Sequence, residues 1–558
     1  MAVVTADDPT APRGSAPPPL ARNAIVILLD SLNRHHVGAY GGTEFATPNL
    51  DRFARRSLRF TRHFTGSLPC IPARHDLLCG AYDFLWKPWG SIEVWEDAIT
   101  YPLRRAGVTT MLVSDHPHLF ENGGENYHTD FTAWDYQRGH ESDAWKTRPD
   151  PTWAGAPSFG RGWTPYDDSR GWFRGEEDFP GPRTMRAAAR WLDAHVGRAR
   201  LDPLVFPPVV GAELAAERAT RAAVGSLAQP RATDRFLLFV DEFDPHEPFD
   251  TPEPWASRYD PDWKGPHLIW PPYRKGAVAG GVIDARQGRQ IRAQYGAKVS
   301  MIDHWLGELL DAIDRHALWD DTLVVVCTDH GHYLGERDVW GKPAVPVQRA
   351  LGHIPLLVAV PGVPPRDVDA LTTSVDLHAT IADLFDVAVR QRTHGSSLLP
   401  LLRGESTTVR EWALTGVWGR EVSVVDGRWS YARAPAGDNA PLSLFSNRWS
   451  TMPIPNAAVD RWELFPPPDE RARLDRMPGS RVPVIRQPFD AQDRIAYWAR
   501  ARFDGNHLYD FTAAPGEEPD LAGERGDARL EARMRDLLRA ALDEVEAPDD
   551  QYRRLGLA

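Results

Sequence analysis

Acids and a histidine follow apolar runs of strand length at two separated places in the chain. The run Ala24–Leu29 ends at Asp30. A second run, Leu323–Cys327, is followed after one residue by Asp329 and His330. Carboxylates and an imidazole that meet at one edge of a sheet suit a hard or borderline divalent cation. The second strand end therefore offers groups that suit such a cation, whereas Asp30 alone could equally be a helix cap or a turn residue.

Cys70 begins a short string that also contains a cation. The residues from Cys70 to Arg74 read Cys-Ile-Pro-Ala-Arg, and Leu-Leu-Cys-Gly follows at 77–80. A single cysteine is most often a small buried hydrophobe, so Cys70 alone would indicate little. On a helix, however, Arg74 lies one turn beyond Cys70. A potential nucleophile and a positive charge would then share one helical face.

Histidines occupy two loops that follow predicted strands. His246 stands among prolines in the stretch Asp-Glu-Phe-Asp-Pro-His-Glu-Pro, after the apolar run Phe236–Val240. His116 and His118 follow the apolar run Thr110–Val113. A lone histidine is more often structural than catalytic, but loops at strand ends carry many functional residues, and prolines fix their course. These three histidines are candidates for contact with a substrate.

The four apolar runs alternate with helical patterns, and this order predicts the fold class. Continuous apolar runs fit strands that are buried on both faces of a parallel sheet. The clearest helical pattern extends from about 290 to 316, with apolar residues three and four apart. We therefore expect an α/β protein with a large mixed, mostly parallel sheet sandwiched by helices. Ligands of such sheets bind at the C-terminal ends of the strands, where Asp30 and Asp329 would lie.

The remainder of the chain divides where its composition changes. We expect a disordered tail at 1–22, a catalytic α/β domain at 23–408 with an insertion at about 120–231, and a smaller C-terminal α+β subdomain at 409–558. Helices are expected in the insertion at about 183–196 and 212–227, and a closing helix at about 528–545. The insertion and the C-terminal subdomain would then carry the choice of substrate.

Composition excludes several classes of protein. The chain has 558 residues, 42% of them hydrophobic and 25% charged, as in ordinary globular proteins. Its 64 Lys and Arg against 77 Asp and Glu give a net charge of −13, which argues against a dedicated nucleic-acid binder. The N-terminus lacks a basic and apolar leader, and no apolar run approaches the ~18 residues that span a bilayer. We expect a cytoplasmic enzyme with no nucleic-acid or membrane partner.

Several of these strings together resemble the signatures of one family, the type I sulfatases of the alkaline phosphatase superfamily. The matching strings are Cys-Ile-Pro-Ala-Arg with Leu-Leu-x-Gly beyond it, Cys-Thr-Asp-His-Gly-His at 327–332, the His-Glu-Pro block at 246–248, and the closing stretch at 507–521. The resemblance covers about 23–540 and leaves the insertion unmatched. It implies an alkaline phosphatase-like fold.

The resemblance also implies a reaction. In this family the cysteine is oxidised after translation to formylglycine, so a formylglycine-generating enzyme would act on Cys70. One hydroxyl of the hydrated aldehyde attacks sulfur, and the other then loses its proton and expels sulfate as the aldehyde re-forms. The implied activity is the hydrolysis of a small-molecule sulfate ester, which releases sulfate and an alcohol or phenol.

Site residues carry over from the family by position. The implied ligands of one divalent metal ion, Ca²⁺ first with Mn²⁺ or Mg²⁺ as alternatives, are Asp30, the modified Cys70, Asp329 and His330. Arg74 would hold the formylglycine hydroxyl, and Lys342 would donate to the sulfate and the leaving oxygen. His246 is the candidate for protonating the leaving group.

Two positions depart from the family pattern. Sulfatases usually carry a second acid directly after the first one, whereas Ser31 follows Asp30 here. They also place a lysine and a histidine against the sulfate, and His116 and His118 keep that two-residue spacing with the lysine replaced. Since imidazole titrates near neutrality, we expect this site to be more sensitive to pH than the lysine version.

Two other functions stay open. Phosphonate monoester hydrolases and related phosphodiesterases use the same formylglycine scaffold with a less acidic first strand end, which Ser31 would fit. A non-catalytic scaffold that binds carbohydrate through its tryptophan-rich insertion is disfavoured, because the whole set of catalytic residue types is present. The sequence leaves the ester (aryl, alkyl, steroid, choline or sugar) and the oligomeric state open.

Overall fold

The computed structural model describes residues 20–140, 179–198, 235–265 and 268–558, with short gaps at 453, 457–460, 464, 494, 496–498, 500–504 and 524–526. Most of the expected N-terminal tail and the helix expected at 212–227 lie outside the described residues. The helix expected at 183–196 is present as α5 (Pro180–Arg198).

One large sheet forms the centre of the molecule. Its strands follow the spatial order β12 (Arg366–Thr373), β2 (Leu58–Phe64), β11 (Leu356–Ala359), β8 (Thr322–Cys327), β1 (Asn23–Leu29), β6 (Phe236–Glu242), β4 (Thr109–Ser114) and β5 (Ala133–Tyr136). Every neighbouring pair is parallel except for the two pairs that β11 makes. The predicted fold class is confirmed, and the four apolar runs are β1, β4, β6 and β8.

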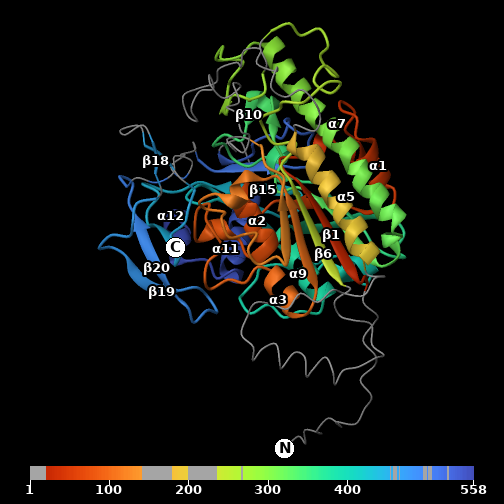
Figure 1. Cartoon of the computed structure of the whole chain (residues 1–558). Coiled ribbons are helices and arrows are strands. Elements are labelled where there is room, and N and C mark those ends of the chain that lie inside the picture. Colours follow the sequence, from red (N-terminus) through yellow and green to blue (C-terminus); the bar gives the residue numbers. More distant parts are fainter. Residues whose placement is uncertain are drawn as a thin grey trace, which may run out of the picture.

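Helices cover both faces of this sheet (Figure 1). One face carries α1 (Pro48–Ala54), α5 and α7 (Ala285–Arg315), and the other carries α2 (Cys70–Cys79), α3 (Thr100–Arg105) and α9 (Val375–Leu384). Successive side chains of a strand point to opposite faces. Accordingly Ile27 belongs to the core beneath α7, and the next residue, Leu28, to the core beneath α2. A strand buried on both faces must be apolar throughout, which explains the continuous runs.

The long helix α7 confirms the helical pattern expected at 290–316. It starts at a capping box, in which Asp284 accepts from the Gln287 N–H and the Gln287 side chain accepts from the Asp284 N–H. These contacts satisfy free N–H groups of the first turn and fix where the helix begins. Ile291, Tyr295 and Ile302 are among its fully buried residues, so its apolar face packs on the sheet.

The registers of the central strands bring three acids to one edge. Leu28 on β1 lies opposite Asp241 on β6 and Cys327 on β8. Because the strands are parallel, the residues that follow these paired positions lie side by side at the same edge of the sheet. Asp30, Asp241 and Asp329 therefore meet at the C-terminal edge of the sheet.

A second sheet joins the C-terminal part of the chain to the segment that precedes Cys70. Its spatial order is β21 (His507–Asp510), β15 (Trp429–Arg433), β14 (Val422–Val425), β13 (Ala413–Val417) and β3 (Ser67–Leu68). The pair β13–β3 is parallel, with Val417 opposite Leu68. The closing helix is α11 (Ala528–Glu544), as expected, and α12 (Asp549–Arg554) follows it. The C-terminal part thus holds one end of the predicted nucleophile segment.

The smaller elements complete the chain. They are β7 (Arg274–Lys275), β9 (Tyr333–Leu334), β10 (Val339–Gly341), α8 (Arg349–Gly352), α10 (Leu399–Arg403), β16 (Leu442–Ser446), β17 (Ile454–Asn456), β18 (Arg461–Glu463), β19 (Arg473–Arg476) and β20 (Pro483–Phe489). Strands β7, β10 and β9 form a small sheet that carries Lys342 directly after its end.

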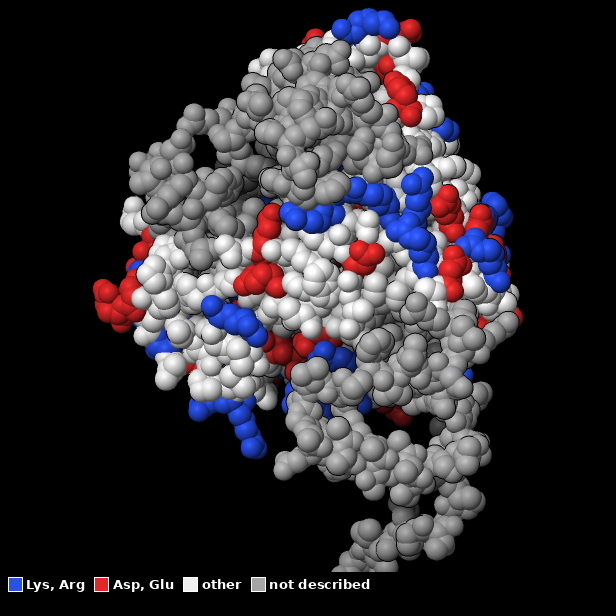
Figure 2. All heavy atoms as spheres, in the orientation of Figure 1, with Lys and Arg blue, Asp and Glu red and all other residues white. Residues whose placement is uncertain are grey.

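Surface charge and hydropathy agree with the composition. Lys and Arg side chains are interspersed with Asp and Glu on the face drawn in Figure 2. In the part of the chain that the structure describes, no helix is both long enough and apolar enough to cross a bilayer.

Candidate active site

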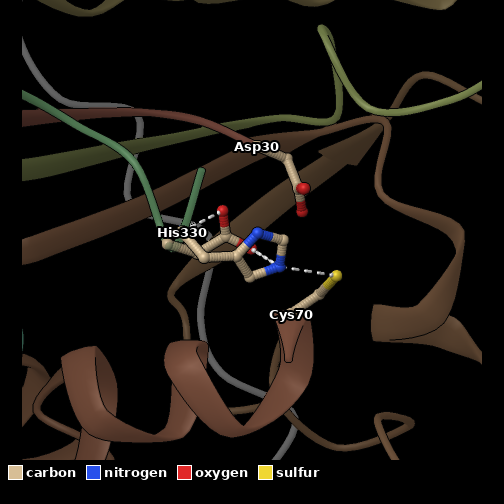
Figure 3. A group of neighbouring side chains, drawn as sticks. Asp30, Cys70 and His330 are labelled. Carbon is tan, nitrogen blue, oxygen red and sulfur yellow. Dashed lines mark hydrogen bonds and ion pairs between the residues drawn. The ribbon is translucent and has the colours of Figure 1, made fainter. Parts of the chain in front are cut away.

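Cys70 is the first residue of α2 and lies directly beneath the edge of the main sheet. All ten residues of α2 are buried, including the charged ones. Figure 3 shows the Cys70 side chain at the start of this helix, with Asp30 opposite it and His330 between them. The Cys70 Sγ lies 3.3 Å from His330 Nε2. The structure thus brings together residues from the ends of two strands and the start of one helix.

The four residues predicted to bind a metal form one compact group. One ligand atom from each of Asp30, Cys70, Asp329 and His330 lies within 4.8 Å of the others, and all four side chains are buried. His330 Nδ1 donates to the Gly331 carbonyl at 2.9 Å, so the Nε2 lone pair points toward Cys70. Two carboxylates, an imidazole nitrogen and the group at position 70 are a donor set that fits a divalent cation.

Arg74 joins this group from the next turn of α2. Its Nη1 lies 2.8 Å from Asp30 Oδ2 and 2.5 Å from Asp329 Oδ2. Its Nε and Nη2 donate to both oxygens of Asp241, at 3.1 and 2.7 Å. The guanidinium, with no exposed surface, therefore binds three carboxylates through its rigid fork of donors. Asp241 was given no role from the sequence, although it ends an apolar run just as Asp30 does.

We call Asp30, Cys70, Arg74, Asp241, Asp329 and His330 the Cys70 cluster. Three carboxylates share one guanidinium here, which leaves two negative charges in excess. Burial raises the pKa of Asp241 to about 6 despite its contact with Arg74. Burial acts in the same direction on Asp30, but Arg74 and three histidines outweigh it and hold the pKa of Asp30 well below its usual range. A divalent cation would balance the excess charge.

The Cys70 thiol is held in its protonated form. Burial, together with the carboxylates of Asp30 and Asp329, raises the pKa of Cys70 well above its usual value. The thiolate is the reactive form of cysteine, and reactive cysteines have lowered pKa values. The site is therefore poorly suited to an unmodified cysteine nucleophile.

Lys342 enters the site from the side of the small sheet. Its Nζ lies 2.9 and 3.0 Å from the two oxygens of Glu247 and 3.2 Å from Ser31 Oγ. Burial opposes its charge, but Glu247, Cys70 and Asp30 raise the pKa of Lys342 above its usual value, so it is an ammonium. Glu247, which the sequence reasoning missed, orients this ammonium. The only sequence signal for it was its place beside His246.

Glu247 binds further groups besides Lys342. Its Oε2 lies 3.1 Å from His332 Nε2 and 3.7 Å from His246 Nδ1. Burial opposes its charge, yet His246, Lys342 and His332 hold the pKa of Glu247 well below its usual range. The carboxylate is thus ionised and fixed between three basic side chains.

Ser31 takes the place where the family pattern has a second acid. Its Oγ donates to Asp30 Oδ1 at 2.7 Å, and its N–H donates to Asp329 Oδ1 at 3.0 Å. Its φ of 62° is in the left-handed region, which is unusual for a serine and sharply turns the chain after β1. Ser31 therefore supplies two hydrogen-bond donors to Asp30 and Asp329 instead of a third negative charge.

The other predicted site histidines lie at the rim of the cluster. His246 Nδ1 donates to the Glu247 carbonyl at 2.6 Å, and its ring stacks on Phe243 at 4.2 Å. His116 Nε2 lies 3.5 Å from Asp30 Oδ2. His118 contacts Glu121, at 3.0 Å, and its ring is 5.3 Å from that of His116. The structure therefore brings His246 and His116 to the cluster and places His118 one ring farther out.

The expected sensitivity of His116 to pH near neutrality is wrong. Burial, with Arg74 nearby, lowers the pKa of His116 well below its usual value. Its Nδ1 accepts from the His118 N–H at 3.2 Å, so Nε2 carries the proton in the neutral ring. His116 is therefore a neutral donor directed at Asp30, and the sequence could not reveal this because the shift comes from burial.

Comparison with known proteins matches the chain to one family of enzymes. Residues 22–387 match the family model described as Sulfatase. The chain is 27% identical over 475 residues to choline-sulfatase from Rhizobium meliloti, which covers 78% of this chain and 82% of the relative. It is 26% identical over 371 residues to human iduronate 2-sulfatase, covering 61% and 60% of the two chains.

A solved structure supports the fold. The phosphonate monoester hydrolase from Silicibacter pomeroyi superimposes with a TM-score of 0.59 at 18% identity, over 95% of this chain and 96% of that one. At this identity the likeness concerns the fold alone. The chain thus shows the predicted fold, the Cys70 cluster and a match to one family model.

Proposed function

The chain belongs to the sulfatase family and is a sulfuric ester hydrolase, and from this premise we propose that it cleaves its substrate through a formylglycine made from Cys70. The observation that carries the proposal is the position of Cys70 Sγ within one group with Asp30, Asp329 and His330. The raised pKa of the thiol supports it as well, because an unmodified cysteine would be unreactive here.

The proposed reaction has two steps at the hydrated aldehyde. One hydroxyl attacks the sulfur of the ester, the bond from sulfur to the leaving oxygen breaks, and the alcohol or phenol departs with a proton. The second hydroxyl then loses its proton, its oxygen re-forms the aldehyde, and sulfate leaves. Water restores the hydrated form. A thiol could not follow this path, because its sulfur-bound product has no comparable exit.

One divalent metal ion belongs to the proposal. Asp30, Asp329, His330 and the modified side chain at 70 would hold it. When bound, the ion lowers the pKa of the attacking hydroxyl and neutralises charge on the transferred group. We propose Ca²⁺, with Mn²⁺ and Mg²⁺ as alternatives, because acids dominate the donor set.

The chain's own cations act on the anionic group and on the acids. Arg74 binds Asp30 and Asp329 and so fixes both acids at the edge of the sheet. Its position one turn from Cys70 directs it at the nucleophile. Lys342, held by Glu247, supplies an ammonium on the opposite side for the sulfate and the leaving oxygen.

Two histidines complete the proposed mechanism. His116 presents Nε2–H toward Asp30 and would donate to a sulfate oxygen. His246 donates through Nδ1 to a backbone carbonyl, which directs Nε2 away from that carbonyl, and we assign it the proton given to the leaving oxygen. His118 would contact the outer part of the substrate.

A phosphonate monoester or phosphodiester hydrolase is the second candidate. Ser31 favours it, because one formal negative charge fewer stands at the first strand end than in the usual sulfatase pattern. A sulfate monoester and a phosphodiester each carry one negative charge, so charge alone does not separate the two.

The test begins with the modification. Trypsin releases residues 63–74 as one peptide, and mass spectrometry of this peptide from protein made with a formylglycine-generating enzyme should show the aldehyde. Active protein with only unmodified cysteine would contradict the proposal. Cys79, buried on the same helix, is the internal control that should stay a thiol.

The substrate class is tested on the same modified protein. We expect an aryl sulfate to be hydrolysed faster than a phosphate diester or a phosphonate monoester. The reverse order would support the second candidate, and no turnover of any of them by fully modified protein would support a binding scaffold. Location in the cytoplasm stays a prediction, to be tested by cell fractionation.

A further inference from the structure

A second group of acids lies on the other face of strand β6 from Cys70. Asp241, at the end of β6, points to Arg74 on the α2 face. The next residue, Glu242, points to the opposite face, where α5 packs. Asp115 directly follows β4 and lies beside Glu242. Alternation along a strand therefore separates the two groups.

We infer that Asp115, His140, Glu242 and Asp244 form a second binding site for a divalent transition-metal ion, with Zn²⁺ as the first probe. We call these four residues the Glu242 cluster. One ligand atom from each of Asp115, His140 and Glu242 lies within 4.8 Å of the others. The inference does not depend on the reaction proposed for Cys70.

The geometry of the cluster suits ligands around one ion. His140 Nε2 lies 2.9 Å from Asp115 Oδ2 and 3.6 Å from Asp244 Oδ1. The side chains of His140 and Asp115 are 5% and 0% exposed. Donor atoms about 3 Å apart are at the spacing expected of neighbouring ligands around an ion with bonds of about 2 Å.

Two carboxylate oxygens of the cluster lack a donor. Glu242 Oε2 and Asp244 Oδ2 receive no hydrogen bond from any residue that the structure describes. Their residues are 0% and 1% exposed, so water does not replace the missing donors at the surface. A buried carboxylate oxygen without a partner is costly, and a bound cation would remove that cost.

The first turn of α5 leaves room beside these oxygens. A Cβ on Gly181 would lie 2.5 Å from Asp244 Oδ2 and 2.8 Å from Glu242 Oε1. Only glycine therefore fits next to the two carboxylates without displacing them. The oxygens converge on one small space at the start of this helix.

Lys298 balances only part of the charge. Its Nζ lies 2.7 Å from Asp244 Oδ1, and it also donates to the carbonyls of His246 and Pro248. An ammonium has three donors, so none is left for Asp115 or Glu242. Three carboxylates against one ammonium leave two negative charges in excess, which equals the charge of one divalent ion.

The kinds of ligand atom in the Glu242 cluster decide which metal ion fits it best. Ca²⁺ takes six to eight oxygen ligands, which this cluster does not supply among the described residues. An imidazole with carboxylate oxygens suits Zn²⁺ or Mn²⁺, and four ligands are the usual number for Zn²⁺ at structural sites. Bound there, the ion would tie the end of β4 to the end of β6, and so fix the loops that carry His116 and His246.

The test is the number of metal ions per chain. After equilibration with Ca²⁺ and chelator-buffered Zn²⁺, elemental analysis for both metals should give two ions for the wild-type chain, one in each cluster. It should give one for Glu242→Gln, one for Asp329→Asn, and none for the double variant. The control Asp303→Asn removes a buried acid that accepts from the Asn49 and Leu50 N–H groups, and should keep two. One ion in the wild type, or two in Glu242→Gln, would overturn the inference.

A second measurement covers variants that fail to fold. In the Asp329→Asn background, added Zn²⁺ should still raise the Tm, since the Glu242 cluster stays occupied. His140→Gln, which removes only the imidazole at the rim, should abolish this rise. A Tm in Asp329→Asn that does not respond to Zn²⁺ or Mn²⁺, or a rise that survives His140→Gln, would overturn the inference. The failure of formylglycine formation at Cys70 would leave the Tm readout unaffected, because that readout concerns the Glu242 cluster alone.

Discussion

The Cys70 cluster and the Glu242 cluster have the same charge count but different cations. Each contains three buried carboxylates and one histidine, and each meets one side chain of fixed positive charge, Arg74 within the first cluster and Lys298 beside the second. The five donors of the guanidinium reach all three acids of the first cluster. The ammonium of Lys298 donates to one acid and two backbone carbonyls. Two oxygens there remain without a donor among the described residues.

The difference shows that the shape of a cation matters as much as its charge. Asp30, in contact with Arg74, keeps its pKa well below the usual range. Glu242, which Lys298 does not reach, has its pKa raised well above it by burial and by its acidic neighbours. A planar fork can therefore hold several acids ionised at one point, whereas a single ammonium cannot.

Replacing the nucleophile should give the largest effect and should separate the two clusters by function. Cys70→Ala removes the side chain to be oxidised, and we expect kcat to fall by on the order of 10⁴-fold or more. The free energy of unfolding should change little, because the change in core volume is small. Initial rates and urea titrations measure the two quantities. Cys79→Ala is the matched control, and equal losses in both variants would contradict the assignment.

Replacing Arg74 by lysine, which changes the shape of the cation and keeps its charge, should give the next largest effect. Arg74→Lys keeps the charge but loses the fork, so at least one of three buried acids loses its partner. We expect about 3 kcal/mol less stability and a fall in kcat of roughly 10²-fold or more. Urea denaturation and initial rates test this.

The matched control for that exchange is another buried arginine. Arg554 has no exposed surface and binds neutral acceptors on Gln551 and Arg420. Arg554→Lys should lower stability without changing kcat. A loss of kcat as large as that of Arg74→Lys would mean that any buried arginine has this effect, and the comparison would fail.

Removing the cation of the second cluster should have a smaller effect. Lys298→Met leaves Asp244 without its ammonium, and we expect about 2 kcal/mol less stability when metal is chelated. The loss should be smaller than for Arg74→Lys, because Lys298 satisfies one acid and not three. Urea titrations of both variants in the same chelating buffer compare them, and a loss larger than that of Arg74→Lys would reverse the ranking.

The smallest effect concerns Asp76, a buried acid whose hydrogen bonds come from uncharged groups of the described residues. Asp76 accepts from the Ser67 N–H at 2.6 Å and from Ser67 Oγ at 2.7 Å. Burial raises the pKa of Asp76 to about 7. The folded protein therefore binds a proton that the unfolded chain, with a pKa near 3.9, has lost, and stability should fall as pH rises from about 4 to 7.

Asp76→Asn should remove that dependence. Asparagine can keep both contacts with Ser67, so we expect the variant to lose on the order of 2 kcal/mol less than the wild type between pH 4.5 and 7.5. Urea titrations across this range give the slope. Parallel curves for the two proteins would show that Asp76 titrates as it does in the unfolded chain.

The central strands, and the gathering of Asp30, Cys70, Asp329 and His330 in one place, could be predicted from the sequence. The run Ala24–Leu29 is apolar because both of its faces are buried, and Asp30 at its end is visible for that reason. The edge strand β12 alternates charged and apolar residues, so it gives no comparable signal. Its neighbour β11 runs against the rest of the sheet, which no local pattern reveals.

Contacts between distant elements could not be predicted. Arg74 was assigned to the nucleophile, yet its bidentate partner Asp241 lies 167 positions away and meets it only in the folded chain. Glu247 was overlooked because its role depends on Lys342, 95 positions later. Burial likewise decides that His116 is a neutral donor, and burial belongs to the fold and not to the residue.

The two-residue strand β3 has a consequence for how the protein is synthesised. It pairs with β13, which the ribosome produces about 350 residues later. At 5–20 residues per second this delay is roughly 15 to 70 s. During that interval β3 lacks its partner strand, and we expect Cys70 to be accessible to an oxidising enzyme. Once β13 is synthesised and pairs with β3, the Cys70 side chain is buried in the folded protein.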